Sequence, residues 1–355
     1  MAGVKVVILN WNGAEVLSRF LPSVVASVPP GVEVVVADNG STDGSAELVR
    51  RGFPSVRVVT LDRNYGFAGG YNRALRGLDA DYFILLNNDV ETPPGWCEPL
   101  VEMLEARPEI AAVAPKILSW AARDTFEYAG ASGGFIDSLG YPFCRGRILD
   151  TLERDRGQYD DAREVFWATG ACLACRAEVF RTLGGFDESF FAHQEEIDLC
   201  WRIWSAGWRV MVEPRSCVWH LGAGTLPPSP QKLYLNYRNN LAMLYKNLPC
   251  GTMQAVVAVR VALNTLAALV YLLRGERENW RAVWRAHRDF VKMVGTPPPD
   301  LATRKISLRD SRRLIRATRV ALPSGVYRGA ILLAHIFGRR KFSELKFQSQ
   351  NISVH

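Results

Sequence analysis

Three adjacent polar residues, Asn87, Asn88 and Asp89, follow the apolar run FILL at 83–86 and precede two prolines. One interpretation is a polar strand end that leads into a proline turn, because amides and carboxylates favour such turns. The other is a cation site beside a phosphate, in which Asp89 supplies the hard oxygen ligand that Mg²⁺ prefers. Taken alone, these residues leave both interpretations open.

A second group of reactive side chains lies in HQEEIDLCWR, at 193–202, which holds Glu195, Glu196 and Asp198. Acidic residues in the first turn of a helix interact favourably with its macrodipole, so the cluster could serve the helix alone. A partly buried carboxylate beside another one has a raised pKa, however, and a raised pKa suits a general base at neutral pH.

Both groups need elements that position them, and the first 120 residues alternate strand and helix patterns. The strand patterns are VKVVILN, VEVVVADN, VRVVTL and YFILLNND, with helix-compatible segments between them. This alternation predicts an α/β fold with a mostly parallel sheet. Ligands bind beyond the carboxyl ends of such strands. Polar residues fall at three of these ends: Asn10 to Asn12, Asp38 to Ser41, and Asn87 to Asp89.

The following residues predict further elements. Residues 121–165 suggest loops and short strands, and 166–185 suggest a strand and a helix closed by Gly184 and Gly185. After the acidic helix, a strand over 209–214 and a second strand ending at His220 are expected. Cys172 and Cys175 form a lone CxxC without a second pair, which favours core packing over a zinc site.

The proline-rich stretch LPPSPQ at 226–231 predicts a boundary between a catalytic domain, 1–228, and a helical basic region, 229–355. Residues 252–273 are apolar enough to span a bilayer, but Arg260 and Asn264 lie on one helical face. Basic clusters at 304–319 and 338–342 flank the apolar stretches. An interfacial membrane helix is favoured, with a true span and a buried helical subdomain as alternatives.

Composition supports the same division. Residues 251–355 carry 19 Lys and Arg against 6 Asp and Glu, although the whole chain has a net charge of only +7. A basic tail on an acidic body indicates an anionic partner. The tail lacks exposed stacking aromatics and a nucleic-acid motif, so we expect membrane rather than nucleic acid. No secretory signal is evident, and seven scattered cysteines fit a reduced compartment.

Seven segments in order resemble the motifs of family 2 inverting glycosyltransferases, and especially the rhamnosyltransferase-like bacterial members that build cell-surface polysaccharide. They are VVILNWNG, VVVADNGSTDGS, NYGFAGGYNRAL, LLNNDV, ATGACLACRAEVF, GGFDESFFAHQEEIDLCWR and HLGAGT. The resemblance covers roughly residues 3–245. It implies a GT-A (Rossmann-like) fold and transfer of rhamnose or another hexose from a nucleotide-diphosphate sugar.

The resemblance also implies roles for single residues. Asp89 takes the last position of the family's Asp-x-Asp motif, with Asn87 in place of its first acid, and His220 resembles a second metal or diphosphate contact. A divalent cation, Mg²⁺ or Mn²⁺, is therefore expected. Contacts to the nucleotide sugar are implied for Leu9, Trp11, Asp38, Arg63, Asn64, Gly69, Gly70, Asn88, Asp89, Gly170, Ala171 and Arg202.

Inversion requires a base that deprotonates the acceptor hydroxyl. Glu196 stands where family members usually carry the catalytic Asp, with Glu195 and Asp198 as neighbouring candidates. Trp167 and His193 are expected in the acceptor pocket. The implied partners are a dTDP-, UDP- or GDP-sugar and a lipid-linked or glycan acceptor, with the enzyme in the cytoplasm, peripheral on the inner face of the membrane.

Two other functions remain. A nucleotidyltransferase that makes nucleotide sugars shares a parallel sheet and a metal, but residues 9–13 lack the basic residue that a triphosphate needs. A non-catalytic scaffold that keeps the fold would explain Asn87 and Glu196 as lost functional residues. Turnover by the wild type, and its loss in Glu196→Gln, separates an enzyme from the scaffold.

Overall fold

The computed structural model describes residues 3–222 and 229–295, with 326–327, 331, 342 and 345. The first elements are β1 (Val4–Asn10), α1 (Ala14–Ser27), β2 (Glu33–Asp38), α2 (Ser45–Gly52), β3 (Arg57–Thr60), α3 (Gly66–Arg76), β4 (Tyr82–Asn87), β5 (Val90–Glu91), α4 (Glu98–Ala106) and β6 (Ile110–Ser119). Then follow β7 (Gly134–Asp137), β8 (Pro142–Cys144), β9 (Arg147–Ile148), β10 (Thr151–Leu152), β11 (Arg163–Glu164), β12 (Cys172–Arg176), α5 (Ala177–Thr182), a 3-10 turn (Glu188–Phe190), α6 (Glu195–Ser205), β13 (Arg209–His220), α7 (Pro230–Asn247), α8 (Cys250–Leu273), α9 (Arg277–Gly295) and β14 (Val326–Tyr327).

A nine-stranded sheet forms the centre of the molecule, in the order β11-β13-β6-β12-β4-β1-β2-β3, with β5 paired to β13. Strands β3, β2, β1 and β4 are mutually parallel, as are β6 and β13, whereas β12 runs antiparallel between β4 and β6. The register pairs Leu9 with Asn87 and Asn10 with Asp38. The predicted mainly parallel α/β fold is confirmed, and its polar strand ends share one edge.

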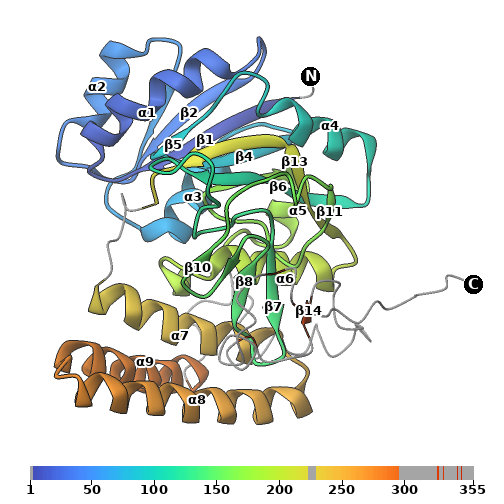
Figure 1. Cartoon of the computed structure of the whole chain (residues 1–355). Coiled ribbons are helices and arrows are strands. Elements are labelled where there is room, and N and C mark those ends of the chain that lie inside the picture. The colour runs from blue at the N-terminus through green and yellow to red at the C-terminus, as the bar shows by residue number, and fades with distance from the viewer. Residues whose placement is uncertain are drawn as a thin grey trace, which may run out of the picture.

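Helices cover both faces of this sheet (Figure 1). Val6 and Ile8 of β1 belong to the apolar cluster that includes Leu17 of α1 and Leu100 of α4. Val7 belongs to the cluster on the other side, with side chains of α3, α5 and α6. Because both faces are buried, these strands are continuously apolar rather than alternating.

One boundary prediction was wrong. Residues 209–220 form a single strand, β13, rather than two strands. The register with β6 shifts between Glu213 and Cys217, where Pro214 lies. A proline has no N–H to donate, and a bulge accommodates it without ending the strand. Cys172 and Cys175 are buried in β12, in agreement with core packing.

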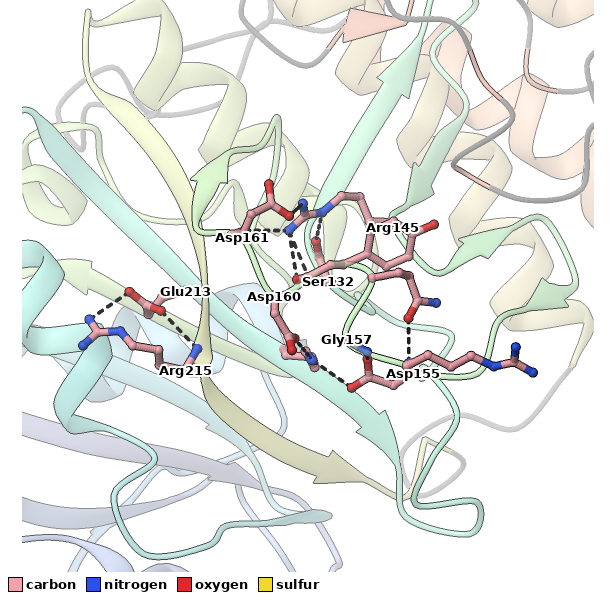
Figure 2. A network of polar contacts seen from close by, with 12 residues as sticks. Ser132, Arg145, Asp155, Gly157, Asp160, Asp161, Glu213 and Arg215 are labelled. Carbon is pink, nitrogen blue, oxygen red and sulfur yellow. Dashed lines mark hydrogen bonds and ion pairs between the residues drawn. The ribbon is translucent and has the colours of Figure 1, made fainter.

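A second, five-stranded sheet, β10-β9-β8-β7-β14, packs beside the first. Buried cations join its connecting loop to the body, as Figure 2 shows for part of this network. Arg145, which is 1% exposed, donates to Ser132 O at 2.9 Å and to Asp161 Oδ1 at 2.6 Å. Lys116 of β6 pairs with Asp155 at 2.7 Å and with Asp160. These pairs fix the loop at 153–161 on the sheet.

The three C-terminal helices stack on the opposite side from β1 and β2, with α7 nearest the sheet domain (Figure 1). Polar groups join α7 to α6. Lys246 of α7 is 2% exposed and lies 2.8 Å from Asp198 of α6 and 3.0 Å from Asp187. Asp198 also accepts from Arg202 Nε at 2.8 Å and from Asn247 Nδ2 at 2.8 Å. The predicted basic clusters at 304–319 and 338–342 lie almost entirely outside the described residues.

Replacing Lys246 by Met tests this junction. Two carboxylates then lose their shared buried cation, and breaking such a pair costs about 3 kcal/mol of unfolding free energy. Lys292→Met on α9 is the control, because its side chain is 66% exposed, and it should cost less than about 1 kcal/mol. Urea unfolding measures both, and equal losses in the two variants contradict a special role for Lys246.

The pH dependence has a definite sign. Burial raises the pKa of Asp187, but Lys246 and the hydrogen bonds from Ser189 outweigh it and lower the pKa to about 2. The contribution of Asp187 to the free energy of unfolding is therefore complete above its unfolded pKa of about 3.9 and is lost as the pH falls towards 2. Lys246→Met should flatten the stability profile over that range.

Candidate active site

A cleft of about 380 Å³ opens beyond the carboxyl ends of β1 and β4, and we refer to it as the strand-end cleft. It gathers polar strand ends, the start of α3, the loop before β12 and the start of α6. The predicted site residues that line it are Leu9, Trp11, Asn64, Asn88, Asp89, Gly170, Ala171, His193, Glu195, Glu196 and His220. Residues more than 200 positions apart therefore meet where the sheet topology places ligands.

The strand ends are held in place by amides. Asn88 Nδ2 donates to Asn10 Oδ1 at 2.9 Å, and Asn10 Nδ2 donates to Ser45 Oγ at 2.9 Å. Asn39, on the neighbouring strand end, donates to Gly66 O at 3.0 Å and so joins β2 to the start of α3. A parallel sheet cannot pair these groups itself once its strands end, so side chains take over that task.

One corner of the cleft holds a buried chain of three ionisable groups. Asp89 Oδ1 lies 3.0 Å from His220 Nε2, and His220 Nδ1 lies 3.3 Å from Glu127 Oε2. His220 ends β13, which pairs with β5 directly after Asp89. Burial opposes a charge on His220, but the two carboxylates outweigh it and raise its pKa to about 10. Asn87 Nδ2 lies 3.4 Å from the same Nε2.

Glu195 and Glu196, at the first turn of α6, also line the strand-end cleft. Glu195 is 3% exposed and Glu196 is partly buried, and in each the Oε2 atom has no hydrogen-bond partner within the part of the chain that the structure describes. Burial raises the pKa of Glu196 to about 7. Burial, and then the neighbouring Glu196, raise the pKa of Glu195 well above its usual range. A carboxylate in this state can accept a proton near neutral pH.

The backbone that leads into α6 is strained. Phe191, His193 and Gln194 have φ angles of 65°, 71° and 75°, a region that side chains other than glycine rarely adopt. Such conformations persist only where surrounding structure enforces them, and they gather at functional sites.

Side chains of helix α7 hold this loop in its strained conformation. Asn239 Nδ2, fully buried, lies 2.8–2.9 Å from the carbonyl oxygens of Phe190, Ala192 and His193. Arg238 Nη2 donates to the carbonyls of Ser189 and Phe190, at 3.0 Å each. The strained loop that positions both glutamates is therefore held from α7.

The structure does not bring Asp198 and Arg202 to the strand-end cleft, although sequence reasoning placed both in the site. Asp198 is fully buried among Arg202, Lys246 and Asn247. Burial raises its pKa, but Lys246 and Arg202 outweigh that effect and lower it. Arg202 also donates to the carbonyls of Leu183 and Gly185 and lines a separate cavity of about 350 Å³ behind α6. These two residues support α6.

Other predicted residues lie just behind the lining. Trp167 is a core residue whose Nε1 donates to Phe135 O at 2.9 Å. Gly69 and Gly70 lie inside α3 rather than in a loop, and a Cβ on Gly70 would meet Leu9 at 2.8 Å, so the glycine lets α3 approach β1. Arg63 and Asp38 do not line the cleft, but Asp38 is 2% exposed beside Asn39, which does.

Sequence reasoning missed Glu127, Asn239, Lys232 and Phe67. Glu127 carries no motif and lies 93 positions from the histidine that it contacts. Asn239 offered one usable signal, because an Asn pair in the middle of a helix is a poor helix former and needs another reason to be there. Lys232, in the first turn of α7, lines the cleft.

The glycosyl transferase family 2 model matches residues 5–184. An N-acetylglucosaminyl-diphospho-decaprenol L-rhamnosyltransferase of Mycobacterium tuberculosis is 32% identical over 235 residues, which cover 61% of this chain and 75% of that protein. The succinoglycan biosynthesis protein ExoA of Rhizobium meliloti is 29% identical, with 78% and 79% covered.

Solved structures agree in fold. The S. aureus TarS fragment 1–349 in complex with UDP-GlcNAc superimposes with a TM-score of 0.55 at 14% identity, covering 88% of this chain and 90% of that one. GalNAc-T7 with UDP, GalNAc and Mn²⁺ gives 0.56 at 18% identity, covering 69% and 48%. The chain therefore belongs to glycosyl transferase family 2 and is a glycosyltransferase.

Proposed function

We propose that the protein is an inverting glycosyltransferase that moves rhamnose or another hexose from a nucleotide-diphosphate sugar to a lipid-linked or glycan acceptor in cell-surface polysaccharide synthesis. The observation that carries the proposal is that two chemically different groups of side chains line one cleft. The Asp89–His220 corner suits a charged leaving group, and Glu196 in the same cleft suits an attacking hydroxyl.

The corner fits a divalent cation by its donors. Asp89 offers a hard carboxylate oxygen and His220 an imidazole nitrogen, a pair that Mn²⁺ accepts and Mg²⁺ accepts less readily. No cluster of three or more His, Cys, Asp and Glu ligands occurs within residues 3–222 and 229–295, so oxygens of the donor diphosphate would complete the shell. A bound cation would neutralise charge that develops on the leaving diphosphate. GalNAc-T7 was solved with UDP and Mn²⁺, which supports this assignment.

His220 must lose its proton before it can bind a cation. Its raised pKa reflects the two carboxylates beside it, and a cation would replace the proton as the group that balances them. Glu127 then orients the ring from the other nitrogen, in the arrangement common to histidine ligands. Asp38, at the end of β2 with an unpartnered buried Oδ1 in the described region, is assigned to the nucleotide base.

Glu196 is assigned as the general base. It accepts the proton of the acceptor hydroxyl as the oxygen attacks the anomeric carbon from the face opposite the leaving diphosphate. Trp11, 47% exposed at the cleft mouth, is available to stack on the base or the sugar. A lipid-linked acceptor is favoured because the name of the M. tuberculosis relative specifies a diphospho-decaprenol acceptor. The enzyme would then act on the cytoplasmic face of the membrane.

Glu196→Gln tests the assignment of the base. Turnover should fall by at least about 10³-fold while donor nucleotide affinity stays within about threefold, because the amide keeps shape but cannot take a proton. Activity assays and calorimetry with UDP, dTDP and GDP measure the two. Glu195→Gln is the matched control and should retain more activity. If Glu196→Gln keeps its turnover while Glu195→Gln loses it, the general base is Glu195. If the wild type binds no nucleotide, the protein is a scaffold.

The pH profile follows from the same carboxylate. A base is active when deprotonated, so kcat should rise with pH through about 7, the pKa of Glu196, and then level off. A profile that is flat between pH 5.5 and about 8 would falsify the assignment.

Glu127→Gln tests the cation corner. The orienting carboxylate is lost, so Mn²⁺ affinity in the presence of nucleotide should weaken by about tenfold or more. Calorimetric titration of the metal provides a readout apart from activity. Glu105→Gln, on the exposed face of α4, should leave the affinity unchanged.

Asn239→Ala tests the support of the strained loop. The carbonyls of Ala192 and His193 lose the Asn239 amide, while Arg238 still donates to Phe190 O. We therefore expect kcat to fall by about 10²-fold while the donor KM changes by less than about threefold. Asn236→Ala, about one turn earlier on α7, is the control, because the Asn236 amide donates to Lys232 O within the same helix. A KM that rises as much as kcat falls indicates general misfolding instead.

A further inference from the structure

Helix α8 exposes large apolar side chains to solvent and buries its one charged residue. Its one charged residue, Arg260, and Asn264 face the protein and are 4% and 2% exposed, while Gln254 near the start of the helix is exposed. Met253 and Val256 also pack inward, but many large apolar residues in the second half of the helix face outward: Val259 is 43% exposed, Leu266 58%, Leu269 47% and Leu273 87%. Surface helices of soluble proteins show the opposite arrangement.

Specific contacts fix this rotation. Arg260 Nη2 donates to Asn240 Oδ1 on α7 at 2.8 Å, and its guanidinium lies 3.4 Å from the centre of the Tyr141 ring. Asn240 in turn donates to Gly140 O at 2.8 Å. Rotating α8 to bury its apolar face would bring Arg260 to the surface and break its buried hydrogen bond to Asn240, which is costly.

The outward face is long and free of charge. Arg260 is the single charged residue among the 24 residues of α8, and it points inward. A helix of this length spans about 36 Å. The exposed large apolar side chains lie between Val259 and Leu273, and exposed apolar surface of this kind marks a site of interaction.

The edge of this face carries positive charge. Arg274 directly follows α8, and α9 beside it exposes Arg277, Arg281 and Arg288 together with Trp284, which is 44% exposed. Arg281 pairs with Glu278 and Arg288 with Asp289, but α9 holds five basic against two acidic residues and stays positive. Arginines that flank apolar side chains and an exposed tryptophan are typical of helices at a membrane interface.

We infer that the outward face of α8 docks on an anionic lipid bilayer and lies in the plane of the interface. The inference deepens the proposed function, on which it rests for a lipid-linked acceptor. A transmembrane position does not fit, because one side of α8 is committed to α7 by a buried arginine. A second copy fits less well than lipid, because a symmetric contact would bring the arginines of both α9 helices together.

The placement suits the acceptor. α7 contacts α8 and α9 on one side, and its first turn carries Lys232 into the strand-end cleft. Figure 1 shows α8 as the outermost layer, with α7 between it and the sheet domain. A diphosphate-linked sugar held in the bilayer would therefore reach the cleft past the start of α7.

The test uses the full chain and flotation with phosphatidylcholine vesicles, with and without about 30% phosphatidylglycerol. The variant carries Leu266→Gln, Leu269→Gln and Leu273→Gln. We expect wild type to float with the anionic vesicles and the variant to lose at least about tenfold in apparent affinity. Leu152→Gln, an equally apolar and 41% exposed site on β10, is the control and should bind as wild type does.

Each other outcome overturns the inference. Wild type that stays with the soluble fraction shows that no membrane is bound, and unchanged flotation of the triple variant shows that another segment binds it. A mass that falls from dimer to monomer in the variant, by light scattering, identifies a second copy as the occupant. Nucleotide titration of the same variant separates this result from failure of the proposed function, since intact donor binding is expected whether or not α8 meets lipid.

Discussion

The whole site depends on the position of α6, because its first turn carries the two glutamates that face the strand-end cleft. That position is not set by α6 itself. The loop before it is strained at Phe191, His193 and Gln194, and α7 holds the loop by its carbonyls and α6 by Asp198. Preorganised polar groups stabilise charge without moving during the reaction, so rigidity here serves chemistry.

The strand ends could be predicted from the sequence because their signal is local. Residues 83–86 are apolar because both faces of their strand are buried, and the apolar run stops where the strand leaves the core. The carboxyl ends of parallel strands then lie together at one edge of the sheet. The roles of Asp198 and Arg202 could not be predicted in the same way. Asp198 and Arg202 follow Glu195 by three and seven residues and so share its face of α6. They lie roughly one and two turns further along the helix axis, however, where α7 and the backbone of Leu183 surround them instead of the cleft.

Contacts across long separations were beyond sequence reasoning for a different reason. Nothing near Glu127 indicates that it meets His220, since that meeting depends on how the segment before β7 folds over β13. Likewise, the apolar character of 252–273 was visible, but the direction in which α8 faces was not. Only the buried contact of Arg260 with Asn240 decides it.

That contact also bears on how the chain is made. By length and composition α8 qualifies as a membrane span, so insertion into a bilayer competes with packing on α7 while the chain is being made. Arg260 contacts Tyr141 and Asn240. Both residues leave the ribosome before α8 does. Domains fold from the N-terminus during synthesis. If the sheet domain and α7 are complete before α8 emerges, Arg260 finds its buried partners in the protein, and the order of synthesis disfavours insertion of α8 as a membrane span.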